Sequence, residues 1–525
     1  MSETRASRKE IARKHLKNNS KQNIFKIAGI VLLAIAVAAG AFFGINKLTQ
    51  NPLASGAPAK TKSFYNQKLN WQPCENGMYC ATMKAPVDWN NPKGDKVNIS
   101  LIKTQATGQK QGSIVMNPGG PGGSGYDWVK DSAMSTISSK VTQSYDIVGF
   151  DPRGINKSDG IKCLDDKQHD AFRANTANMD TDSGLTQLRS QYKKIADSCK
   201  KNSGPVLAHM DTASVARDMD LIRALIGEQK LNYLGFSYGT LLGATYANLY
   251  PDHVGHMVLD GAVDPALSYS EVTKTQAAGF EQALKEYAQN CVKQQPCPLD
   301  PDGTEDANAI VSSIQKMLND NLAKPMKTSD GRTATSSILA QGIMVPLYNN
   351  LLWPTLSQAI SDAMAGKPDR LVQFSDASAE RGDDGKYTGN SDFSFMAVNC
   401  LDYSIPSDTK SIRADEAALE KVSPTFGRYM AGGGVICENW PYSSIRKIGP
   451  ISTTSKSPLL VIGTSGDPAT PFASAQNLTK ELGNARLLKW NGQGHTAYGR
   501  SNDCVRDTVD NYFLSGNLPE NNKTC

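Results

Sequence analysis

Short apolar runs, each ending in a turn rich in glycine or small residues, recur in both end portions of this 525-residue chain. Most are followed by a stretch with helical periodicity. Alternation of strand and helix predicts a mostly parallel sheet covered by helices on both faces, the α/β class. The strands are expected at 97–101, 113–117, 146–150, 231–236, 256–260, 458–463 and 485–490, and the later helices at 472–482 and 503–514.

The middle of the chain interrupts this alternation. Residues 266–454 are dominated by Ala, Gln, Ser, Lys and Met, with few strand-like runs. We expect a mainly helical cap inserted between core segments 63–265 and 455–525, over the carboxyl edge of the sheet, where open α/β sheets bind ligands. Within the first core segment, Thr212 is expected to cap a helix whose apolar side chains recur at spacings of three and four.

The N-terminal region predicts export. Residues 1–26 form a basic, cytoplasmic segment, residues 27–45 are all apolar or Gly, and residues 46–62 form a linker. Nineteen residues make a helix of about 28 Å, close to the thickness of the bilayer hydrocarbon, and the basic flank should stay inside. Everything after Lys47 is then extracellular, either anchored in the membrane or secreted after cleavage; the sequence leaves both open.

Charge argues against a nucleic-acid partner. Residues 1–26 carry eight basic and two acidic side chains, a balance of +6, whereas the whole chain carries +5. Subtracting the first from the second leaves −1 for everything downstream. A near-neutral body without a basic stripe does not fit nucleic acid.

All ten cysteines follow the apolar segment. None forms a C-x-x-C pair and no histidine cluster accompanies them, so we expect disulfides rather than a metal site. Spacing does not determine connectivity. Our hypothesis is nearest-neighbour pairing: Cys74–Cys80, Cys163–Cys199, Cys291–Cys297, Cys400–Cys437 and Cys504–Cys525.

A candidate nucleophile lies where a predicted strand turns into a predicted helix. Residues 235–239 read Gly-Phe-Ser-Tyr-Gly, which matches G-x-S-x-G with Ser237 at its centre. The pentapeptide alone is weak, but strand before and helix after is the context that a nucleophile elbow requires. The alternative is an ordinary strand-to-helix turn.

Serine needs a base, and the base needs an acid to orient it. His495 lies in a Gly-rich loop between the last strand and the last helix, and it is the one histidine placed where the α/β-hydrolase order puts the base. Asp467 follows strand 458–463 and is the favoured acid. Asp264 is the competing acid, and Asp260 is interpreted as a buried carboxylate that organises a loop.

A second Gly-rich turn, 117–123, follows strand 113–117. Glycine lets backbone N–H groups approach a substrate oxygen, so Gly119 and Gly120, with the N–H of Tyr238, are predicted to form an oxyanion hole. Gly120, Gly122 and Gly125 also satisfy G-x-G-x-x-G, a dinucleotide fingerprint. Export and the unexplained Ser, Asp and His loops count against that alternative, and no cofactor or metal is expected.

These motifs together resemble the secreted peptidases of the α/β-hydrolase fold related to prolyl iminopeptidases, in particular the actinobacterial tripeptidyl aminopeptidase branch. The resemblance spans about residue 65 to the C-terminus and rests on 117–125, 151–158, 235–240, 396–402, 463–471 and 492–499. Pro118, Asn156 and the GFSYG pentapeptide depart from the prolyl iminopeptidase pattern. They favour release of a longer N-terminal piece than a single proline.

The resemblance implies that short peptides, often tripeptides, are removed from free N-termini through an acyl-enzyme. A free ammonium requires a negative group in the cap. Asp402 and Glu438 are the candidates, because each lies near a cysteine expected to tie the cap together; the alternative is a solvated or helix-capping carboxylate. Asp151 and Arg153 are expected to organise a loop. An esterase or lipase with the same triad, or an inactive surface-binding protein, remains open.

Overall fold

The computed structural model describes residue 53 and residues 57–525. Two compact units divide the chain, residues 1–67 and residues 68–525. The first contains the short helix α2 (Lys62–Tyr65). The predicted segments 1–26 and 27–45 lie outside the described residues, so the membrane anchor stays a prediction. Within the described part, no helix has the length and apolar character needed to cross a membrane.

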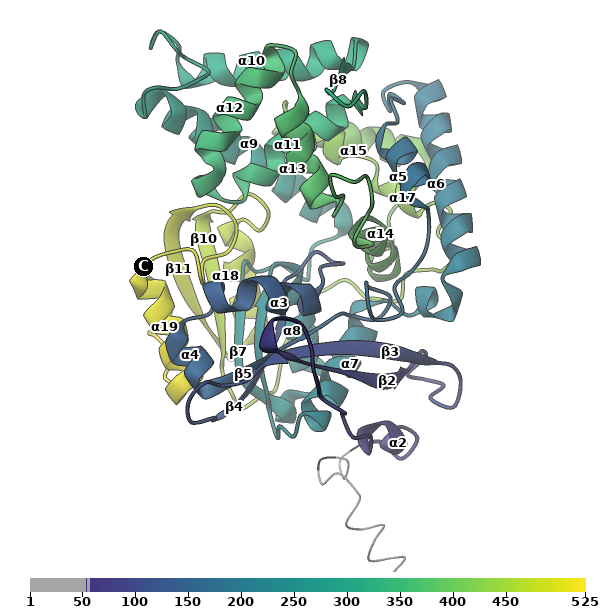
Figure 1. The fold of residues 1–525 in the computed structure, drawn as a ribbon, viewed down its shortest axis with the longest axis vertical. Coiled ribbons are helices and arrows are strands. Elements are labelled where there is room, and N and C mark those ends of the chain that lie inside the picture. Colours follow the sequence, from purple (N-terminus) through teal and green to yellow (C-terminus); the bar gives the residue numbers. More distant parts are fainter. Residues whose placement is uncertain (1–52, 54–56) are drawn as a thin grey trace, which may run out of the picture. The chain divides into compact units, whose positions relative to one another are not determined.

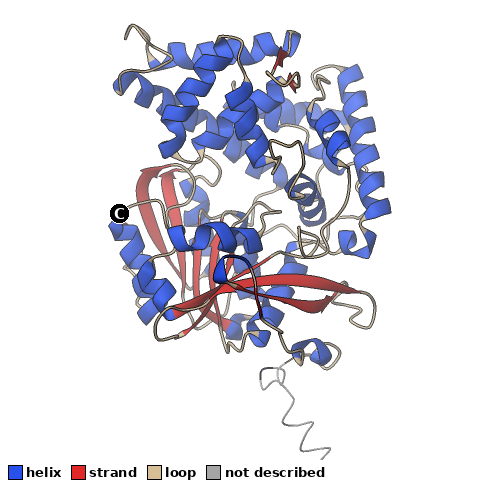
Figure 2. Cartoon of the chain, in the orientation of Figure 1, coloured by secondary structure: helices blue, strands red, loops and turns tan. Residues whose placement is uncertain are grey.

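A ten-stranded sheet forms the centre of residues 68–525, in the order β1-β2-β3-β5-β4-β6-β7-β10-β11-β12 (Figure 2). Strands β1 to β3 pair antiparallel, as do β3 and β5, and from β5 through β4 to β12 all pairs are parallel. The α/β prediction is therefore confirmed. The bounds are β1 (Gln72–Pro73), β2 (Tyr79–Pro86), β3 (Lys96–Thr104), β4 (Gly112–Asn117), β5 (Tyr145–Phe150), β6 (Leu231–Phe236), β7 (Val254–Asp260), β10 (Leu459–Gly466), β11 (Ala485–Gln493) and β12 (Lys523–Thr524).

Helices cover both faces of the parallel part, which is why every residue of β4 and β5 is buried. On one face, α3 (Gly125–Thr136), α4 (Ser139–Ser144) and α19 (Asp503–Ser515) share a core with alternate strand residues. The opposite face contacts α8 (Tyr238–Leu249) and α18 (Phe472–Leu482), and α7 (Thr212–Leu225) packs on α8. The cap of α7 is Asp211, whose carboxylate accepts the Ser214 N–H, so the prediction of Thr212 as the cap is one residue off.

A layer of helices lies over the carboxyl edge of the sheet (Figure 1). It has its own apolar core, built mainly from α9, α10, α11 and α12. Besides a short hairpin, β8 (Met326–Lys327) and β9 (Thr333–Ala334), its elements from the middle of the chain are α9 (Tyr269–Lys293), α10 (Ala307–Ala323), α11 (Ser336–Leu347), α12 (Trp353–Met364), α13 (Asp369–Ser378), α14 (Ser391–Asp402), α15 (Thr409–Val422), α16 (Gly427–Met430) and α17 (Gly433–Cys437).

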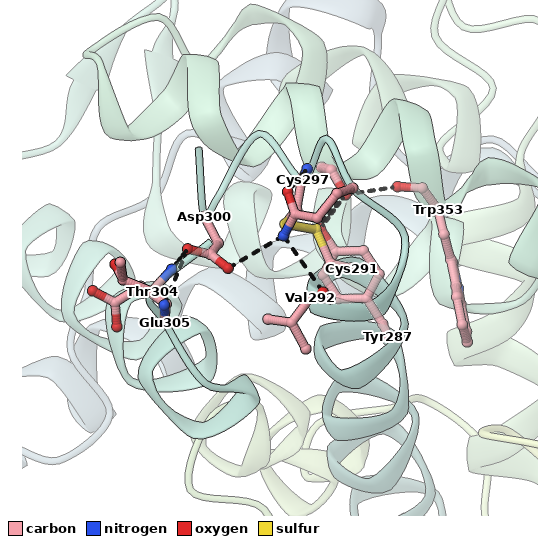
Figure 3. Close-up of a disulfide and its surroundings, with 10 residues drawn as sticks. Tyr287, Cys291, Val292, Cys297, Asp300, Thr304, Glu305 and Trp353 are labelled. Carbon is pink, nitrogen blue, oxygen red and sulfur yellow. Dashed lines mark hydrogen bonds between the residues drawn. A yellow bond between two sulfur atoms is a disulfide. The ribbon is translucent and has the colours of Figure 1, made fainter. Parts of the chain in front are cut away.

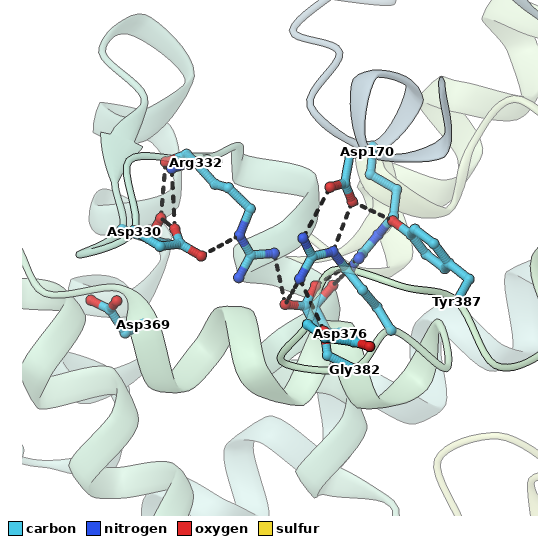
Figure 4. A network of polar contacts seen from close by, with 12 residues as sticks. Asp170, Asp330, Arg332, Asp369, Asp376, Gly382 and Tyr387 are labelled. Atoms are coloured by element: carbon cyan, nitrogen blue, oxygen red, sulfur yellow. Dashed lines mark hydrogen bonds and ion pairs between the residues drawn. The ribbon is translucent and has the colours of Figure 1, made fainter. Parts of the chain in front are cut away.

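Two more helices join this layer from the segment assigned to the core, α5 (Asp166–Arg173) and α6 (Asp182–Asn202). Ion pairs attach α5: Arg173 bonds Asp376 of α13 at 2.6 Å, and Arg381 bonds Asp170 at 2.8 Å. Figure 4 shows Asp170 and Asp376 within this network of polar contacts. In α6, Leu185 belongs to an apolar cluster with Ile412 of α15 and Val435 of α17. The helical layer therefore draws on two stretches of chain, because amphipathic periodicity does not show which partner a helix packs against.

All five disulfides pair nearest neighbours, as predicted: Cys74–Cys80, Cys163–Cys199, Cys291–Cys297, Cys400–Cys437 and Cys504–Cys525. Figure 3 shows one of them closing the end of α9, where the Asp300 carboxylate accepts the N–H groups of Thr304 and Glu305. The Cys400–Cys437 disulfide connects α14 to α17.

Candidate active site

Ser237 occupies a strained turn between β6 and α8. Its φ of 54° and ψ of −124° lie in a region that residues other than glycine seldom adopt. The Ser237 N–H donates to the Asp260 carbonyl at 2.9 Å, which fixes the turn against β7. A Cβ on Gly235 would lie 2.5 Å from the Gly239 carbonyl oxygen, so the tight turn requires glycine there. This strained strand-to-helix turn has the geometry that a nucleophile elbow requires.

His495 and Asp467 form a tight pair. Nδ1 of His495 lies 2.9 Å from each carboxylate oxygen of Asp467, whose side chain is fully buried. The carboxylate also accepts the backbone N–H groups of Ala469, Thr470 and Thr496 at 2.8–3.2 Å. These bonds orient the carboxylate, and the carboxylate holds the imidazole with Nδ1 as its donor atom.

The other imidazole nitrogen is free. Nε2 of His495 is buried and has no hydrogen-bond partner among the described residues. A Cβ placed on Gly261 would lie 3.1 Å from Cε1 of the imidazole, and Gly261 follows the residue that binds the Ser237 N–H. The imidazole therefore lies next to the elbow without a hydrogen bond to the serine hydroxyl, a looseness common in active sites without substrate.

Several contacts hold the histidine loop. The His495 N–H donates to the Tyr348 carbonyl at 2.8 Å, and Arg500 donates to the Thr496 carbonyl at 2.7 Å. Asp260 accepts the N–H groups of Ala497 and Tyr498 at 2.7–3.0 Å. Burial raises the pKa of Asp260 to about 6. These bonds agree with the interpretation of Asp260 as a loop-organising carboxylate.

Asp264, the competing acid, has other partners. It accepts hydrogen bonds from the Asn477 amide at 2.7 Å and from the Ala266 N–H at 2.9 Å. His495 is bonded to Asp467 instead. The arrangement favours Asp467 as the acid.

The glycine turn after β4 packs directly on the elbow. A Cβ on Gly119 would lie 2.6 Å from the Phe236 carbonyl oxygen and 2.9 Å from Cβ of Ser237. The Gly119 N–H, however, donates to the Asn117 side chain at 3.0 Å. Gly119 therefore provides close approach rather than a donor, which corrects that part of the oxyanion-hole prediction. The N–H groups of Gly120 and Tyr238 remain as the candidate donors.

A cavity of about 740 Å³ opens beside this turn and extends into the helical layer. That volume lies in the range of ligand sites. Its wall includes Gly120, Pro121, Arg173, Asp180, Tyr192, Gln341, Glu380, Ser391, Asp392, Phe395 and Arg428.

Neither predicted amine-binding carboxylate lines this cavity. Asp402 is 1% exposed and accepts hydrogen bonds from the N–H and hydroxyl of Thr212 at the start of α7. Burial raises its pKa to about 6. Glu438 forms an ion pair with Arg189 at 2.8 Å. Proximity to a cysteine correctly predicted that each residue lies in the helical layer, but it does not determine which way the side chain points.

Three carboxylates that the sequence interpretation missed do line the cavity: Asp180, Glu380 and Asp392. The carboxylate of Asp392, in the first turn of α14, lies 2.9 Å from Nε2 of the buried His169. No sequence signal singled out these residues, because isolated acids in helical stretches are usually solvated. Asp180 also lies within 4.8 Å of Glu416 and Glu420, but Arg428 pairs with Asp180, so the group is already partly neutralised.

Asp151 and Arg153 organise a loop, as expected. Arg153 and Asp218 are both fully buried and form a two-point ion pair at 2.6 and 2.7 Å. Asp151 accepts the Ser124 hydroxyl at 2.5 Å and the Lys157 N–H at 3.0 Å. Burial raises the pKa of Asp151. These bonds account for both side chains without a role in chemistry.

A parallel sheet with a serine at the β6 elbow, an aspartate after β10 and a histidine after β11 defines the α/β-hydrolase class. Family models agree: that of the alpha/beta hydrolase fold matches residues 112–302, and that of the TAP-like proteins matches residues 423–525.

Relatives match nearly the whole chain. Serine protease Hip1 of Mycobacterium tuberculosis is 31% identical, over 95% of this chain and 98% of its own length. Carboxylesterase B of the same species is 33% identical, over 85% and 86%. Tripeptidyl aminopeptidase of Streptomyces coelicolor is 29% identical, over 90% and 88%. The chain belongs to the TAP-like family of α/β-hydrolases and is a hydrolase.

Proposed function

We propose that the protein is an exported serine peptidase that removes short peptides, dipeptides or tripeptides, from free N-termini. The observation that carries the proposal is the Asp467–His495 pair beside the Ser237 elbow, next to a large cavity walled by helices. A cavity that opens beside the glycine turn and is walled by helices accommodates a chain end of limited length. The peptidase names of two relatives support the same assignment.

The chemistry proposed is acyl transfer. His495 takes the proton of the Ser237 hydroxyl, and the oxygen attacks the peptide carbonyl. The N–H groups of Gly120 and Tyr238 stabilise the oxyanion of the tetrahedral intermediate. His495 then protonates the leaving amine and activates the water that hydrolyses the acyl-enzyme, while Asp467 stabilises the imidazolium.

Recognition of a free N-terminus requires a carboxylate within the cavity, because an ammonium loses its hydration there. Asp392 is our choice among the lining carboxylates. It belongs to α14, whose first turn lies against the glycine turn, and His169 fixes its orientation. Asp392→Asn is expected to raise KM for substrates with a free amine and to leave N-acetylated ones unaffected.

Export is part of the proposal. The apolar segment 27–45 and the basic residues before it support translocation, and five disulfides fit an oxidising compartment. The catalytic part is then extracellular, and the segment 27–45 either anchors it to the membrane or is removed. Membrane fractionation with N-terminal sequencing of the mature protein distinguishes the two outcomes.

The test is hydrolysis of a library of unblocked peptides, read by mass spectrometry of the products. Release of dipeptides or tripeptides from free N-termini, abolished in Ser237→Ala, supports the proposal. Ser237→Ala removes a single oxygen, so it should keep the fold. Turnover that persists in this variant contradicts the mechanism, and products from internal or C-terminal cleavage contradict the specificity.

The second candidate is an esterase that uses the same residues, favoured by the relative named Carboxylesterase B. Parallel assays on tripeptide amides and on acyl esters separate the two activities. Labelling of Ser237 by a fluorophosphonate distinguishes both from an inactive binding protein, because a serine without an activating base reacts poorly.

A further inference from the structure

Helix α14 lies against the glycine turn of the candidate oxyanion hole and is linked through Thr212 to Tyr238. At its start, a Cβ on Gly122 in the glycine turn would lie 3.0 Å from the Ser391 carbonyl oxygen and 3.2 Å from Cβ of Ser394. At its end, the Asp402 carboxylate accepts the Thr212 N–H at 3.0 Å and the Thr212 hydroxyl. One helix of the helical layer therefore lies against the turn of Gly120 and is bonded to the start of α7.

The chain of bonds continues from Thr212 to the elbow. The Thr212 hydroxyl contacts the Tyr238 phenol oxygen at 2.6 Å. Thr212 and Asp402 are each 1% exposed and Tyr238 is 8% exposed, so water does not compete for these bonds. Tyr238 is the residue whose N–H is the second candidate oxyanion donor.

We infer that Asp402 and Thr212 are positioning residues that hold the Tyr238 N–H in place for the oxyanion. The inference rests on the proposed function. A carboxylate at a helix N-terminus binds N–H groups left without intrahelical partners and interacts favourably with the helix dipole, so Asp402 fixes the first turn of α7. With its hydroxyl bonded to that carboxylate, Thr212 has one preferred orientation toward the phenol. Tyr238 is thereby held by its side chain as well as by the elbow.

This role explains why a carboxylate from the helical layer is buried away from the cavity. The same helix presents Ser391, Asp392 and Phe395 to the cavity. The surface that contacts substrate and the support of the oxyanion donors thus belong to one rigid element. Precise placement of donors is worth large factors in rate, since they act only on charge that develops in the transition state.

The experiment compares Thr212→Val, which keeps the shape of the side chain but removes the hydroxyl, with Thr212→Ser, which retains it. Thr479→Val, on the outer helix α18, is the matched control for the substitution itself. For the full-length chain we measure kcat and KM with a tripeptidyl aminomethylcoumarin. We also measure inhibition by a tripeptide aldehyde, which forms a tetrahedral adduct, and by the free tripeptide product.

Thr212→Val is expected to lower kcat roughly 10- to 100-fold with KM changed less than about twofold. Inhibition by the aldehyde should weaken in proportion, while inhibition by the product stays constant, and Thr212→Ser should recover most of kcat. A kcat equal to that of Thr479→Val overturns the inference. So does a parallel rise of KM and of the product inhibition constant, since that indicates damage to the substrate cavity.

Tyr238→Phe, which removes the phenol oxygen, decides the matter by the same criteria if Thr212→Val fails to fold. The rate of fluorophosphonate labelling separates this inference from the proposed function. If the wild-type chain labels rapidly but cleaves no peptide, the peptidase proposal fails, and slower labelling of Thr212→Val still supports the positioning role. If labelling is equally fast in both proteins, the positioning role is overturned whatever the substrate.

Discussion

Asp467→Asn gives the sharpest test of the candidate triad, because every bond of this carboxylate is defined. Oδ1 accepts the N–H groups of Ala469 and Thr470 at 2.9 and 2.8 Å, and Oδ2 accepts the Thr496 N–H at 3.2 Å and the Thr470 hydroxyl at 3.0 Å. An asparagine has one acceptor oxygen. The first position faces two backbone N–H groups, whereas the second faces one N–H and a hydroxyl that can rotate and accept instead. Its amide nitrogen therefore occupies the second position, 2.9 Å from Nδ1 of His495.

The amide N–H then donates to Nδ1, so the neutral imidazole carries its proton on Nε2. That tautomer cannot accept the proton of Ser237. The loss expected is about 10⁴-fold in kcat, equivalent to roughly 5.5 kcal/mol of transition-state stabilisation. The Thr496 N–H also faces a donor in place of an acceptor, which costs about 1–3 kcal/mol of folding stability.

The assay is single-turnover hydrolysis of a tripeptidyl aminomethylcoumarin together with the rate of fluorophosphonate labelling. Asp264→Asn is the matched control, since Asp264 bonds Asn477 and Ala266 and makes no bond to His495. We expect its kcat to stay within a few-fold of wild type. A kcat within tenfold of wild type for Asp467→Asn, or an equal loss in Asp264→Asn, refutes the assignment of the acid.

Two stability predictions follow from buried charges. Arg153→Met leaves Asp218 without its ion-pair partner in the core and should lower the free energy of unfolding by about 3–5 kcal/mol. The double variant with Asp218→Leu should recover part of this loss. Urea denaturation measures the stability of both variants, and a loss under 1 kcal/mol in Arg153→Met contradicts the pairing. Asp260 has a pKa of about 6 against an ordinary 3.8, so the folded state binds its proton more tightly. The protonated Asp260 therefore adds to the free energy of unfolding. This stabilisation is complete below pH 4, is lost as pH rises through 6, and amounts to about 3 kcal/mol. Asp260→Asn should flatten the stability profile between pH 4 and 7, and an unchanged slope contradicts the assignment.

The positions of the candidate catalytic loops were predictable because each depends on local sequence. A strand followed by Gly-x-Ser-x-Gly, or by a Gly-rich loop with Asp467 or His495, places its side chain at the carboxyl edge of a parallel sheet whatever the rest of the chain does. The nearest-neighbour pairing of the cysteines was also correct, although spacing did not determine it; the paired residues are 6 to 37 positions apart.

The predictions that failed depend on where individual groups point and pack, which residue type and spacing do not determine. The Gly119 N–H was lost to the Asn117 side chain two residues away, a local bond that glycine content does not reveal. Asp402 was placed in the correct layer, but the rotation of α14 turns its carboxylate toward Thr212. Helices α5 and α6 have ordinary amphipathic patterns. Ion pairs across about 200 residues of sequence attach α5 to α13 and to the residues just after it, and an apolar cluster joins α6 to α15 and α17.

The bond from the His495 N–H to the Tyr348 carbonyl has a practical consequence for protein engineering. Tyr348 belongs to the inserted stretch, so the backbone of the proposed base is secured by a segment that appears optional in a fold diagram. Grafting a foreign lid onto this scaffold, or trimming the insertion to a short loop, would remove that acceptor. A chimera designed to change substrate preference should therefore retain residues 348–350 or supply an equivalent carbonyl.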